Sequence, residues 1–251
     1  MPLNYAHRGA SGYYPENTMI AFEKAIELGC DAIETDVQMT SDGVLVLIHD
    51  EDVSRTTDGS GLVKDYTFNN LRKLSAGSWY DKKFSSEKIP TAEELILLAK
   101  SKGIKVNFEL KTGIVLYPGI EEQIINLIYK YNMEHHVILS SFNHYSMVHC
   151  KEINKNITTG LLYVEGLYRP ALYCKSIGCD AIHPDYHTVT EEIVLEAKQN
   201  RILVNAYTVD DENIMKRLLS WKIDGIITNY PDKLAKLKEA CQRKKSCEPS
   251  P

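Results

Sequence analysis

Short apolar segments of strand length alternate with amphipathic helical segments along most of the chain. Three of these transitions share one phrase: "LGCDAIETDVQ" at residues 28–38 is echoed by "IGCDAIHPDY" at 177–186 and, more faintly, by "KIDGIITNYPD" at 222–232. Before the first copy, Met19, Phe22 and Ile26 form an apolar helix face, and Gly29 is placed to end that helix in a left-handed conformation. A helix that leads into a short buried strand, repeated along a chain, is typical of βα units and a parallel sheet.

Nine segments have the pattern of strands, one more than a (β/α)8 barrel needs. The surplus lies in "VQMTSDGVLVLIHD", where the link "QMTSDG" is too short for a parallel crossover and contains an Asp42-Gly43 turn signal. We interpret Val37–His49 as an antiparallel hairpin on the second barrel strand, which returns His49 to about the level of Asp36. The remaining eight strands predict a TIM barrel. The nine segments are Leu3–His7, Ala32–Val37, Val44–His49, Lys105–Leu110, Val137–Ser141, Thr158–Leu162, Asp180–His183, Leu203–Thr208 and Gly225–Thr228.

Residues 50–90 form an insertion after this hairpin. They are rich in Ser, Thr, Gly and Asp, with one short amphipathic piece around Phe68–Leu74. A loop of this length is uncommon in a compact domain unless it is functional or disordered, so we expect a small cap over the barrel mouth. We expect residues 1–240 to form one barrel domain that includes the insertion, and residues 241–251 to form a flexible tail.

Composition narrows the function classes. A net charge of −5 over 251 residues argues against a nucleic-acid partner, which needs a basic surface. No apolar run approaches the roughly 20 residues that span a bilayer, and the basic run "RKK" at 243–245 is too short for a membrane anchor. The start "MPLNYAHRG" lacks a signal-peptide pattern, and six scattered cysteines without a CxxC pair favour reduced thiols, so we expect a cytoplasmic protein. The oligomeric state is left open.

Carboxylates occupy the strand ends at which TIM barrels place their chemistry. In "DAIETDV" strand alternation puts Glu34 and Asp36 on one face, and in "KVNFELK" it puts Glu109 on the face opposite the apolar residues. Barrel interiors are normally apolar, so inward carboxylates require partners. Three carboxylates at strand ends suit Mg²⁺ or Ca²⁺. A buried ion-pair network with Arg8 or Lys111 explains the spacing equally well.

Two histidines favour the catalytic interpretation. His7 ends the first strand and His49 ends the hairpin, and imidazole titrates near neutral pH, so together they form a candidate acid–base pair. Arg8 and Lys111 supply cationic donors for an anionic oxygen, most naturally that of a phosphoryl group. Histidines, a divalent cation and basic side chains in one place indicate phosphodiester cleavage.

Four further residues support weaker inferences. His183 ends a strand in the second copy of the repeated phrase, and it either faces the substrate or is a satisfied buried histidine. Phe142 and Tyr207 either line the mouth or simply pack there. We attribute Asn17 in "PENT" to capping of the helix that follows it.

The motifs as an ordered set closely resemble those of the glycerophosphodiester phosphodiesterases. The matching stretches are "HRGASGYYPENTMIAFEKAIELGCDAIETDVQMTSDGVLVLIHDEDVSRTTDGSG", "IPTAEELI", "FELK" and "DGIITNYPD", and the resemblance runs from about residue 5 to about residue 237. It implies a TIM barrel with a small insertion that cleaves glycerophosphodiesters to sn-glycerol 3-phosphate and an alcohol with a divalent metal. It also implies roles for seven residues: Glu34, Asp36 and Glu109 as metal ligands, His7 and His49 as general acid and base, and Arg8 and Lys111 as phosphate-holding cations.

Three positions depart from the family pattern. Ala92 stands where "PTLEE" is usual, Tyr207 stands where a tryptophan is common, and Asn229 replaces the aspartate of "TDYP". None is one of the seven core residues. We therefore expect the departures to act on the alcohol pocket and on the preference for a head group.

Two alternatives compete with a metal-dependent glycerophosphodiesterase that acts on a small-molecule substrate. A phospholipase-type barrel acting on lysolipid phosphodiesters would need an apolar rim, and the insertion offers only Leu62, Val63, Phe68 and Trp79 in a polar setting. A non-catalytic phosphodiester-binding barrel would be favoured by the loss of a histidine or a carboxylate. All five of those residues are present, so we predict the enzyme.

Overall fold

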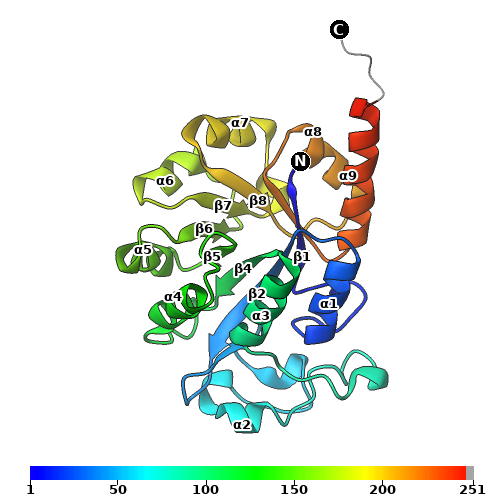
Figure 1. Cartoon of the computed structure of the whole chain (residues 1–251). Coiled ribbons are helices and arrows are strands. Elements are labelled where there is room, and N and C mark those ends of the chain that lie inside the picture. The colour runs from blue at the N-terminus through cyan, green and yellow to red at the C-terminus, as the bar shows by residue number, and fades with distance from the viewer. Residues whose placement is uncertain (247–251) are drawn as a thin grey trace.

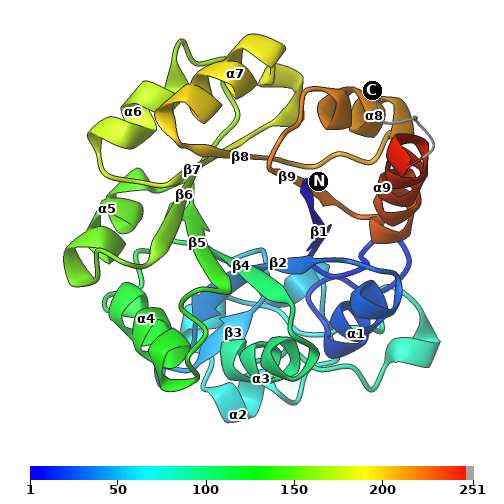
Figure 2. The same cartoon turned by 45° about the horizontal axis from the view of Figure 1, so that its top comes forward.

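Eight parallel strands close into a barrel in the computed structural model, which describes residues 1–246 (Figures 1 and 2). Neighbouring strands follow the order β1-β9-β8-β7-β6-β5-β4-β2, and pairing of β1 with β2 completes the ring. The predicted TIM barrel is therefore confirmed. The strands are β1 Leu3–His7, β2 Ala32–Met39, β3 Leu45–Leu47, β4 Lys105–Leu110, β5 Val137–Ser141, β6 Thr158–Tyr163, β7 Ala181–Pro184, β8 Leu203–Ala206 and β9 Gly225–Thr228.

The ninth strand, β3, is the predicted hairpin arm. It runs antiparallel to β2 with Val37 opposite Leu47, and the N–H of Ile48 donates to the carbonyl of Asp36 at 3.1 Å. This pairing returns the chain to the level of Asp36, so His49 arrives beside the end of β2, as the turn signal predicted.

The helices surround the barrel, and the start of the first one corrects the sequence interpretation (Figure 2). Helix α1 ends before Gly29, which has φ +83°, but its N-cap is Thr18 and not Asn17, because the Thr18 side chain accepts the N–H of Ala21. Helix α9 continues through residues 241–246 of the predicted tail, while residues 247–251 lie outside the described part of the chain. The α-helices are α1 Met19–Glu27, α2 Phe68–Leu71, α3 Ala92–Lys102, α4 Ile120–Lys130, α5 His144–Ile153, α6 Pro170–Ser176, α7 Glu191–Asn200, α8 Glu212–Ser220 and α9 Pro231–Ser246.

Alternation along the strands separates an apolar outer face from a polar inner one. Ile33 and Val37 of β2 pack with Phe108 of β4 and Phe22 of α1 in the main apolar cluster, between the barrel and its helices. Burying a side chain of this size contributes roughly 1.5–3 kcal/mol. A one-residue slip of β2 would reverse its two faces, so these contacts fix the register that turns Glu34 inward.

The insertion packs on the hairpin, beyond the ends of β2 and β3 (Figure 1). Val46 of β3 and the insertion residues Val53 and Leu71 belong to a second, smaller apolar cluster. Arg72 ties the insertion to α3 through two hydrogen bonds to Glu94, at 2.8 and 2.6 Å. A short helix at Phe68–Leu71 confirms the amphipathic piece, and the other elements are three short 3-10 helices at Val53–Arg55, Val63–Asp65 and Lys82–Phe84.

Candidate active site

Strands β2 and β4 bring three carboxylates together inside the barrel. Glu34 and Asp36 lie on β2, and Asp36 is the direct register partner of Glu109 on β4. The three side chains are buried, and each offers a carboxylate oxygen within 4.8 Å of the other two. The three carboxylates therefore lie close together, as the sequence predicted.

Burial and mutual repulsion act strongly on this cluster. Burial, followed by the charges of Asp36 and Glu109, raises the pKa of Glu34 well above its usual range, and burial and Asp36 raise that of Glu109. Burial by itself also raises the pKa of Asp36, but Arg8, His49 and Lys111 outweigh it and lower that pKa to about 2. The protein alone therefore does not compensate all three negative charges.

The cluster fits a divalent cation bound by oxygen ligands. Asp36 Oδ1 is buried, yet it accepts no hydrogen bond from any residue that the structure describes. A buried acceptor without a partner costs free energy, and a cation among the carboxylates would remove that cost. An all-carboxylate donor set is one that Mg²⁺ and Ca²⁺ prefer.

Two basic side chains border the carboxylates. Arg8 Nε lies 3.3 Å from Asp36 Oδ2, and Arg8 Nη1 donates to Glu16 Oε1 at 2.9 Å. Lys111 Nζ lies 2.9 Å from Glu109 Oε1 and 3.8 Å from Asp36 Oδ1. The buried ion-pair network that the spacing left open is thus present, and it shares its residues with the candidate metal site.

Asn17 belongs to this site rather than to a helix cap. Its Nδ2 donates to Asp36 Oδ2 at 2.8 Å, and its Oδ1 accepts from Thr35 Oγ1 at 2.7 Å. Its backbone adopts φ +54°, a conformation that asparagine tolerates better than most residues. Asn17 therefore fixes the orientation of the Asp36 carboxylate, a role that the sequence interpretation missed.

His7 has an amide as its hydrogen-bond partner. Its Nδ1 lies 2.7 Å from Asn229 Oδ1, while Asn229 Nδ2 donates to Asp210 Oδ2 at 2.6 Å. Because the Asp210 carboxylate only accepts, the amide oxygen must face His7, so His7 Nδ1 carries the proton and Nε2 carries the lone pair. Nε2 lies 3.9 Å from Glu34 Oε2, and burial together with Arg8 lowers the pKa of His7 to about 4.

This contact corrects the interpretation of Asn229. We expected the three departures from the family pattern to act on the alcohol pocket and not on the core residues. Asn229 instead contacts His7 directly, and neither motif alone could show this because the two residues are 222 positions apart.

His49 has a carboxylate as its partner. Its Nδ1 lies 2.5 Å from Asp50 Oδ1, and Arg55 of the insertion pairs with Asp50 and with Glu16. Burial raises the pKa of Asp50, but hydrogen bonds from Arg55 and His49 outweigh it and lower the pKa to about 2, so this partner is ionised. Because an ionised carboxylate only accepts, His49 Nδ1 donates its proton to Asp50, and this contact orients the ring.

His7 and His49 share one pocket of about 160 Å³ with Glu34 and Glu109 at the carboxyl ends of the strands, whereas Asp36 is not among the residues that line it. One half of its wall is ionic and comes from β1, β2, β4 and the hairpin. The other half is largely apolar, and there Phe142 stacks edge-on against Tyr207 with ring centroids 6.0 Å apart. The Tyr207 hydroxyl donates to the Tyr163 carbonyl at 2.9 Å, so the ring forms the wall. The lining residues are His7, Arg8, Glu34, His49, Asn107, Glu109, Phe142, Leu162, Tyr207, Thr208 and Ile227.

His183, a predicted substrate-binding residue, is not among the residues that line the pocket. It is fully buried in the barrel, and its Nε2 lies 3.0 Å from Asn205 Nδ2. A Cβ on the neighbouring Gly160 would lie 2.6 Å from that nitrogen, so only glycine leaves room for the ring. Burial lowers the pKa of His183 to about 3, and its buried Nδ1 has no hydrogen-bond partner among the described residues, so His183 is buried but is not the fully satisfied histidine of the alternative interpretation.

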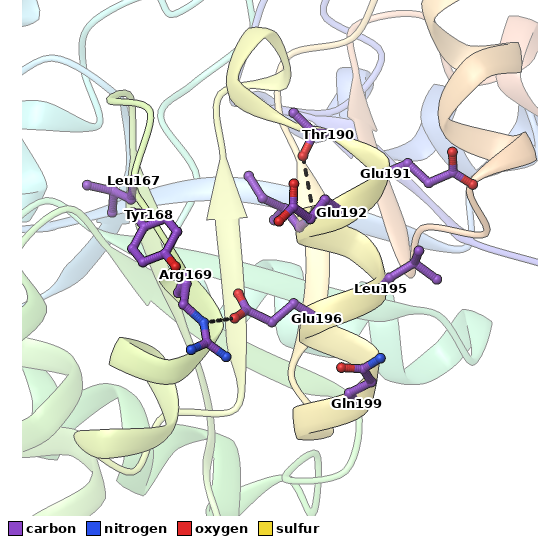
Figure 3. Close-up of a pocket in the computed structure, with 10 residues that line it drawn as sticks. Leu167, Tyr168, Arg169, Thr190, Glu191, Glu192, Leu195, Glu196 and Gln199 are labelled. Atoms are coloured by element: carbon purple, nitrogen blue, oxygen red, sulfur yellow. Dashed lines mark hydrogen bonds and ion pairs between the residues drawn. The ribbon is translucent and has the colours of Figure 1, made fainter.

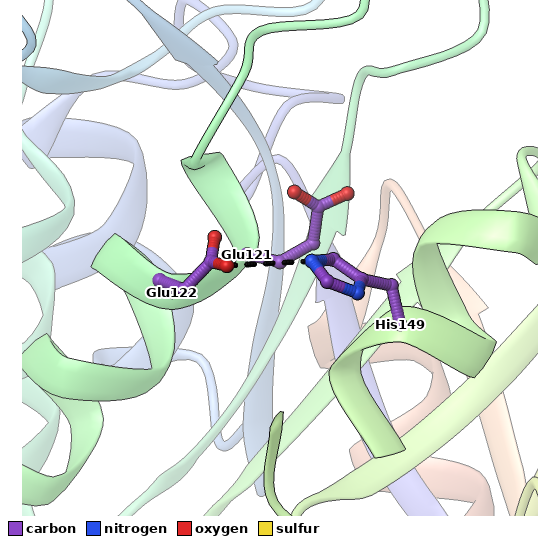
Figure 4. Close-up of side chains that lie close together, drawn as sticks. All are labelled: Glu121, Glu122 and His149. Carbon is purple, nitrogen blue, oxygen red and sulfur yellow. Dashed lines mark ion pairs between the residues drawn. The ribbon is translucent and has the colours of Figure 1, made fainter. Parts of the chain in front are cut away.

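A second group of possible metal ligands lies on the outer helices. Glu121 and Glu122 of α4 approach His149 of α5 (Figure 4). His149 is nearly half exposed, and its two ring nitrogens lie 3.4 Å from Glu122 Oε1 and 3.4 Å from Glu152 Oε2. The hydrogen bond to Glu152 raises the pKa of His149, so a surface ion-pair cluster accounts for this group.

The fold and the site define a TIM-barrel phosphodiester hydrolase, and comparison with known proteins specifies the family. The model of the glycerophosphoryl diester phosphodiesterase family matches residues 7–233, so the chain belongs to that family. No helix within residues 1–246 is long and apolar enough to cross a membrane.

Relatives and solved structures agree with this assignment. A glycerophosphodiester phosphodiesterase of Caldanaerobacter subterraneus subsp. tengcongensis is 47% identical over 94% of this chain and 97% of its own length. One from Bacillus altitudinis is 39% identical over 94% and 97% of the two chains. An Oleispira antarctica phosphodiesterase, solved in complex with the product sn-glycerol-3-phosphate, superposes with a TM-score of 0.85 at 30% identity, covering 95% of this chain and 97% of that one. The chain is thus a glycerophosphodiester phosphodiesterase by family and fold.

Proposed function

We propose that this enzyme adds water across the bond between phosphorus and the alcohol oxygen of a glycerophosphodiester. The products are sn-glycerol 3-phosphate, as in the Oleispira antarctica complex, and the free alcohol. The observation that carries the proposal is that His7 and His49 face one pocket together with Glu34 and Glu109.

Glu34, Asp36 and Glu109 would hold one divalent cation, Mg²⁺ or Ca²⁺. Such a cation stabilises the negative charge that accumulates on the phosphoryl oxygens. The support for this site is the burial of the three carboxylates, their mutual repulsion and the unsatisfied Asp36 Oδ1.

Arg8 and Lys111 bind the phosphoryl oxygens that do not react. Burial alone lowers the pKa of Lys111, but Glu109 and Asp36 outweigh it and raise that pKa, so the ammonium is charged at neutral pH. The Arg8 guanidinium is held in position by Glu16 and presents several N–H donors from a rigid plane. Both groups therefore stabilise charge without moving a proton.

His7 acts as the general base. Its Nδ1–H donates to Asn229, which leaves the Nε2 lone pair free on the side of Glu34. From there it takes the proton of the attacking oxygen, whether that oxygen belongs to water or to the glycerol of the substrate.

His49 acts as the general acid. Its Nδ1–H donates to Asp50, which leaves Nε2 for the pocket that His49 lines, and the protonated ring gives its Nε2 proton to the alcohol oxygen as the bond to phosphorus breaks. The assignment of the two roles rests on the different partners of the two Nδ1 atoms.

The insertion contributes to this site through Arg55. That guanidinium pairs with Asp50 and with Glu16, so it links the partner of His49 to the residue that holds Arg8. We propose that residues 50–90 act as a cap that organises the acid side of the pocket, while Phe142 and Tyr207 form the wall against the substrate.

A reducing, cytoplasmic location is part of the same proposal. The cysteines of the described chain, Cys30, Cys150, Cys174, Cys179 and Cys241, form no disulfides, and four of them are buried. Buried free thiols favour a reducing compartment.

Product analysis tests the proposed reaction. Glycerophosphocholine is incubated with the enzyme and Mg²⁺ or Ca²⁺, and choline, glycerol 3-phosphate, glycerol and phosphocholine are each quantified. We expect choline and glycerol 3-phosphate in equal amounts. Glycerol and phosphocholine would mean cleavage of the other ester bond, and no release with any of several head groups would favour a binding-only barrel.

A further inference from the structure

A second pocket, of about 280 Å³, lies at the amino ends of the barrel strands, opposite the catalytic pocket. Leu3, Lys105 and Leu203 in its wall are the first residues of β1, β4 and β8. It shares no lining residue with the catalytic pocket, and its volume is close to the lower end of the range for small-molecule sites. We refer to it as the basal pocket; its ionisable lining residues are Tyr5, Lys105, His135, His136 and Asp224.

The inner end of the basal pocket is polar. Tyr5 and Asn205 line it, and each is only 1% exposed. The Tyr5 hydroxyl is buried and has no hydrogen-bond partner within residues 1–246. Burial, with the charges of Asp224 and Asp31, raises the pKa of Tyr5, so the hydroxyl keeps its proton and remains a donor. A buried donor without a partner costs free energy, and an oxygen atom of a ligand in the pocket would recover that cost.

A glycine holds this inner end together. A Cβ at Gly225 would lie 2.3 Å from Asn205 Oδ1 and 2.7 Å from Tyr5 Cε2, so any other residue would displace both side chains. Asn205 is also held from within the barrel, where its Nδ2 lies 3.0 Å from His183 Nε2. Tyr5 and Asn205 are therefore fixed side by side at the end of the pocket.

The mouth of the basal pocket is basic, although the chain carries a net charge of −5. Lys105, His135 and His136 are exposed there, and none of their side chains forms a hydrogen bond or an ion pair with another described residue. Asp224 is the only carboxylate among the lining residues, and its Oδ2 accepts the N–H of Val204 at 2.9 Å. Basic side chains that gather without carboxylate partners favour an anion.

A larger groove on the outside of the barrel differs in these respects (Figure 3). It has a volume of about 700 Å³ and lies between the loop after β6 and helix α7. Arg169 in its wall pairs with Glu196 at 2.6 Å, and the Thr190 side chain accepts the N–H of Ile193 at 3.2 Å. The polar side chains of this groove thus have partners in the protein, in contrast to the Tyr5 hydroxyl.

We propose that the basal pocket binds a small phosphomonoester, with the phosphate at the basic mouth and a hydroxyl of the organic part at Tyr5. A phosphomonoester carries about two negative charges at neutral pH and accepts several hydrogen bonds, which suits Lys105 with His135 and His136 beside it. sn-Glycerol 3-phosphate has both required groups. The site is separate from the reaction, so this inference does not depend on the proposed function.

The two ends of the pocket fix the orientation of the ligand. The charges of Asp224 and Asp31 act on Tyr5, so the inner end disfavours an anionic group and accepts a neutral hydroxyl. Leu3, Ile138 and Leu203 supply apolar wall around the carbon atoms of the ligand. The phosphate is therefore left at the mouth, where the basic side chains are.

Histidine NMR tests the site, because the imidazole signals of His135 and His136 report on it separately from those of His7 and His49. The protein is titrated with sn-glycerol 3-phosphate, inorganic phosphate and glycerate at constant pH and ionic strength. We expect glycerol 3-phosphate to shift the signals of His135 and His136 with a Kd of about 1 mM or lower. Inorganic phosphate should bind more weakly because it cannot reach Tyr5, and glycerate should bind more weakly because it carries a single charge.

Two variants test the two ends of the pocket. Lys105→Gln should weaken the binding of both glycerol 3-phosphate and inorganic phosphate about tenfold. Tyr5→Phe keeps the ring, and it should weaken glycerol 3-phosphate about three- to tenfold while leaving inorganic phosphate unchanged. Lys216→Gln, an exposed lysine of the outer helix α8, is the matched control and should bind both as the wild type does.

Several outcomes would overturn the basal site. One is the absence of any shift of His135 and His136 at about ten times the expected Kd. Shifts that persist in Lys105→Gln, or that are equally large for the exposed His187, would show a general effect of salt. Equal binding of glycerate would contradict the phosphate class. Failure to cleave glycerophosphocholine would leave these results unaffected, since they are measured without turnover.

Discussion

His7 Nδ1 lies 2.7 Å from Asn229 Oδ1, so the base of the proposed reaction is oriented by a neutral amide. His49 differs, because its Nδ1 faces the ionised Asp50. Each of these acceptors keeps a proton on the Nδ1 that it faces and so leaves Nε2 of each histidine for the reaction. The two histidines therefore differ in the charge of the group that holds each Nδ1–H, and the proposed roles of base and acid follow this difference.

Leaving-group chemistry should separate the two roles. His7→Ala and His49→Ala should each lower kcat for glycerophosphocholine by about 10²–10⁴. A p-nitrophenyl ester of glycerol phosphate has a leaving group that needs no proton. With this substrate, the kcat of His49→Ala should be within about tenfold of the wild-type value, while the kcat of His7→Ala should remain low. His187→Ala, an exposed histidine paired with Asp185, is the control and should be unaffected. Recovery of His7→Ala instead would reverse the assignment.

Asn229 should act on the rate through His7. Asn229→Ala removes the acceptor of the Nδ1 proton, so both tautomers become accessible, and kcat should fall by about 10–100-fold with little change in KM. Asp210→Asn should give a smaller fall in the same direction, because the amide of Asn229 loses the anchor that orients it. A change in KM alone would show that Asn229 serves the alcohol pocket, as the sequence suggested.

Cation binding should stabilise the fold independently of catalysis. At a cation concentration of about 100 times Kd, ligand linkage adds about 2.7 kcal/mol, which raises Tm by roughly 5–10 °C for a chain of this size. Glu109→Gln should abolish most of this shift, whereas Glu122→Gln, in the surface cluster of α4 and α5, should retain it. Differential scanning calorimetry with Mg²⁺ and with Ca²⁺ measures the effect, and equal shifts in both variants would place the cation elsewhere.

His183 should make the fold sensitive to acid. Its pKa is lowered by burial to about 3, against about 6.5 in an unfolded chain, so the unfolded state binds the proton first. Neutral His183 makes its full contribution to the free energy of unfolding above pH 6.5. This contribution is lost as the pH falls towards 3, by about 2 kcal/mol between pH 7 and pH 5. In urea titrations, the free energy of unfolding of His183→Gln should therefore depend less steeply on pH than that of the wild type. The exposed His187→Gln should follow the wild type, and parallel curves for all three proteins would contradict the argument.

Much of the fold was accessible from the sequence because it depends on local patterns. The alternation of Glu34 and Asp36 with Ile33 and Val37 fixed both faces of β2, and the Asp42-Gly43 signal distinguished a hairpin from a ninth barrel strand. Strand ends meet at one edge of a parallel barrel, so residues placed there by pattern were bound to approach one another.

Contacts between distant segments were not accessible in this way. Asn17 matches a capping pattern, and only the three-dimensional structure shows its amide turned to Asp36 while Thr18 caps the helix. His183 also ends a strand, but its ring lies in the interior against Asn205 rather than in the pocket. Strand alternation tells which face a residue occupies and leaves its depth in the barrel undetermined.

Restoring activity with metal is the most direct test of the account. The enzyme is freed of metal with EDTA, and release of glycerol 3-phosphate from glycerophosphocholine is followed as Mg²⁺ or Ca²⁺ is added back, for the wild type, Glu109→Gln and Glu122→Gln. We expect no release without metal, recovery of activity in the wild type and in Glu122→Gln, and a kcat at least about 100-fold lower for Glu109→Gln. Full activity in EDTA, or equal recovery of all three proteins, would contradict the claim that the carboxylates inside the barrel hold a catalytic cation.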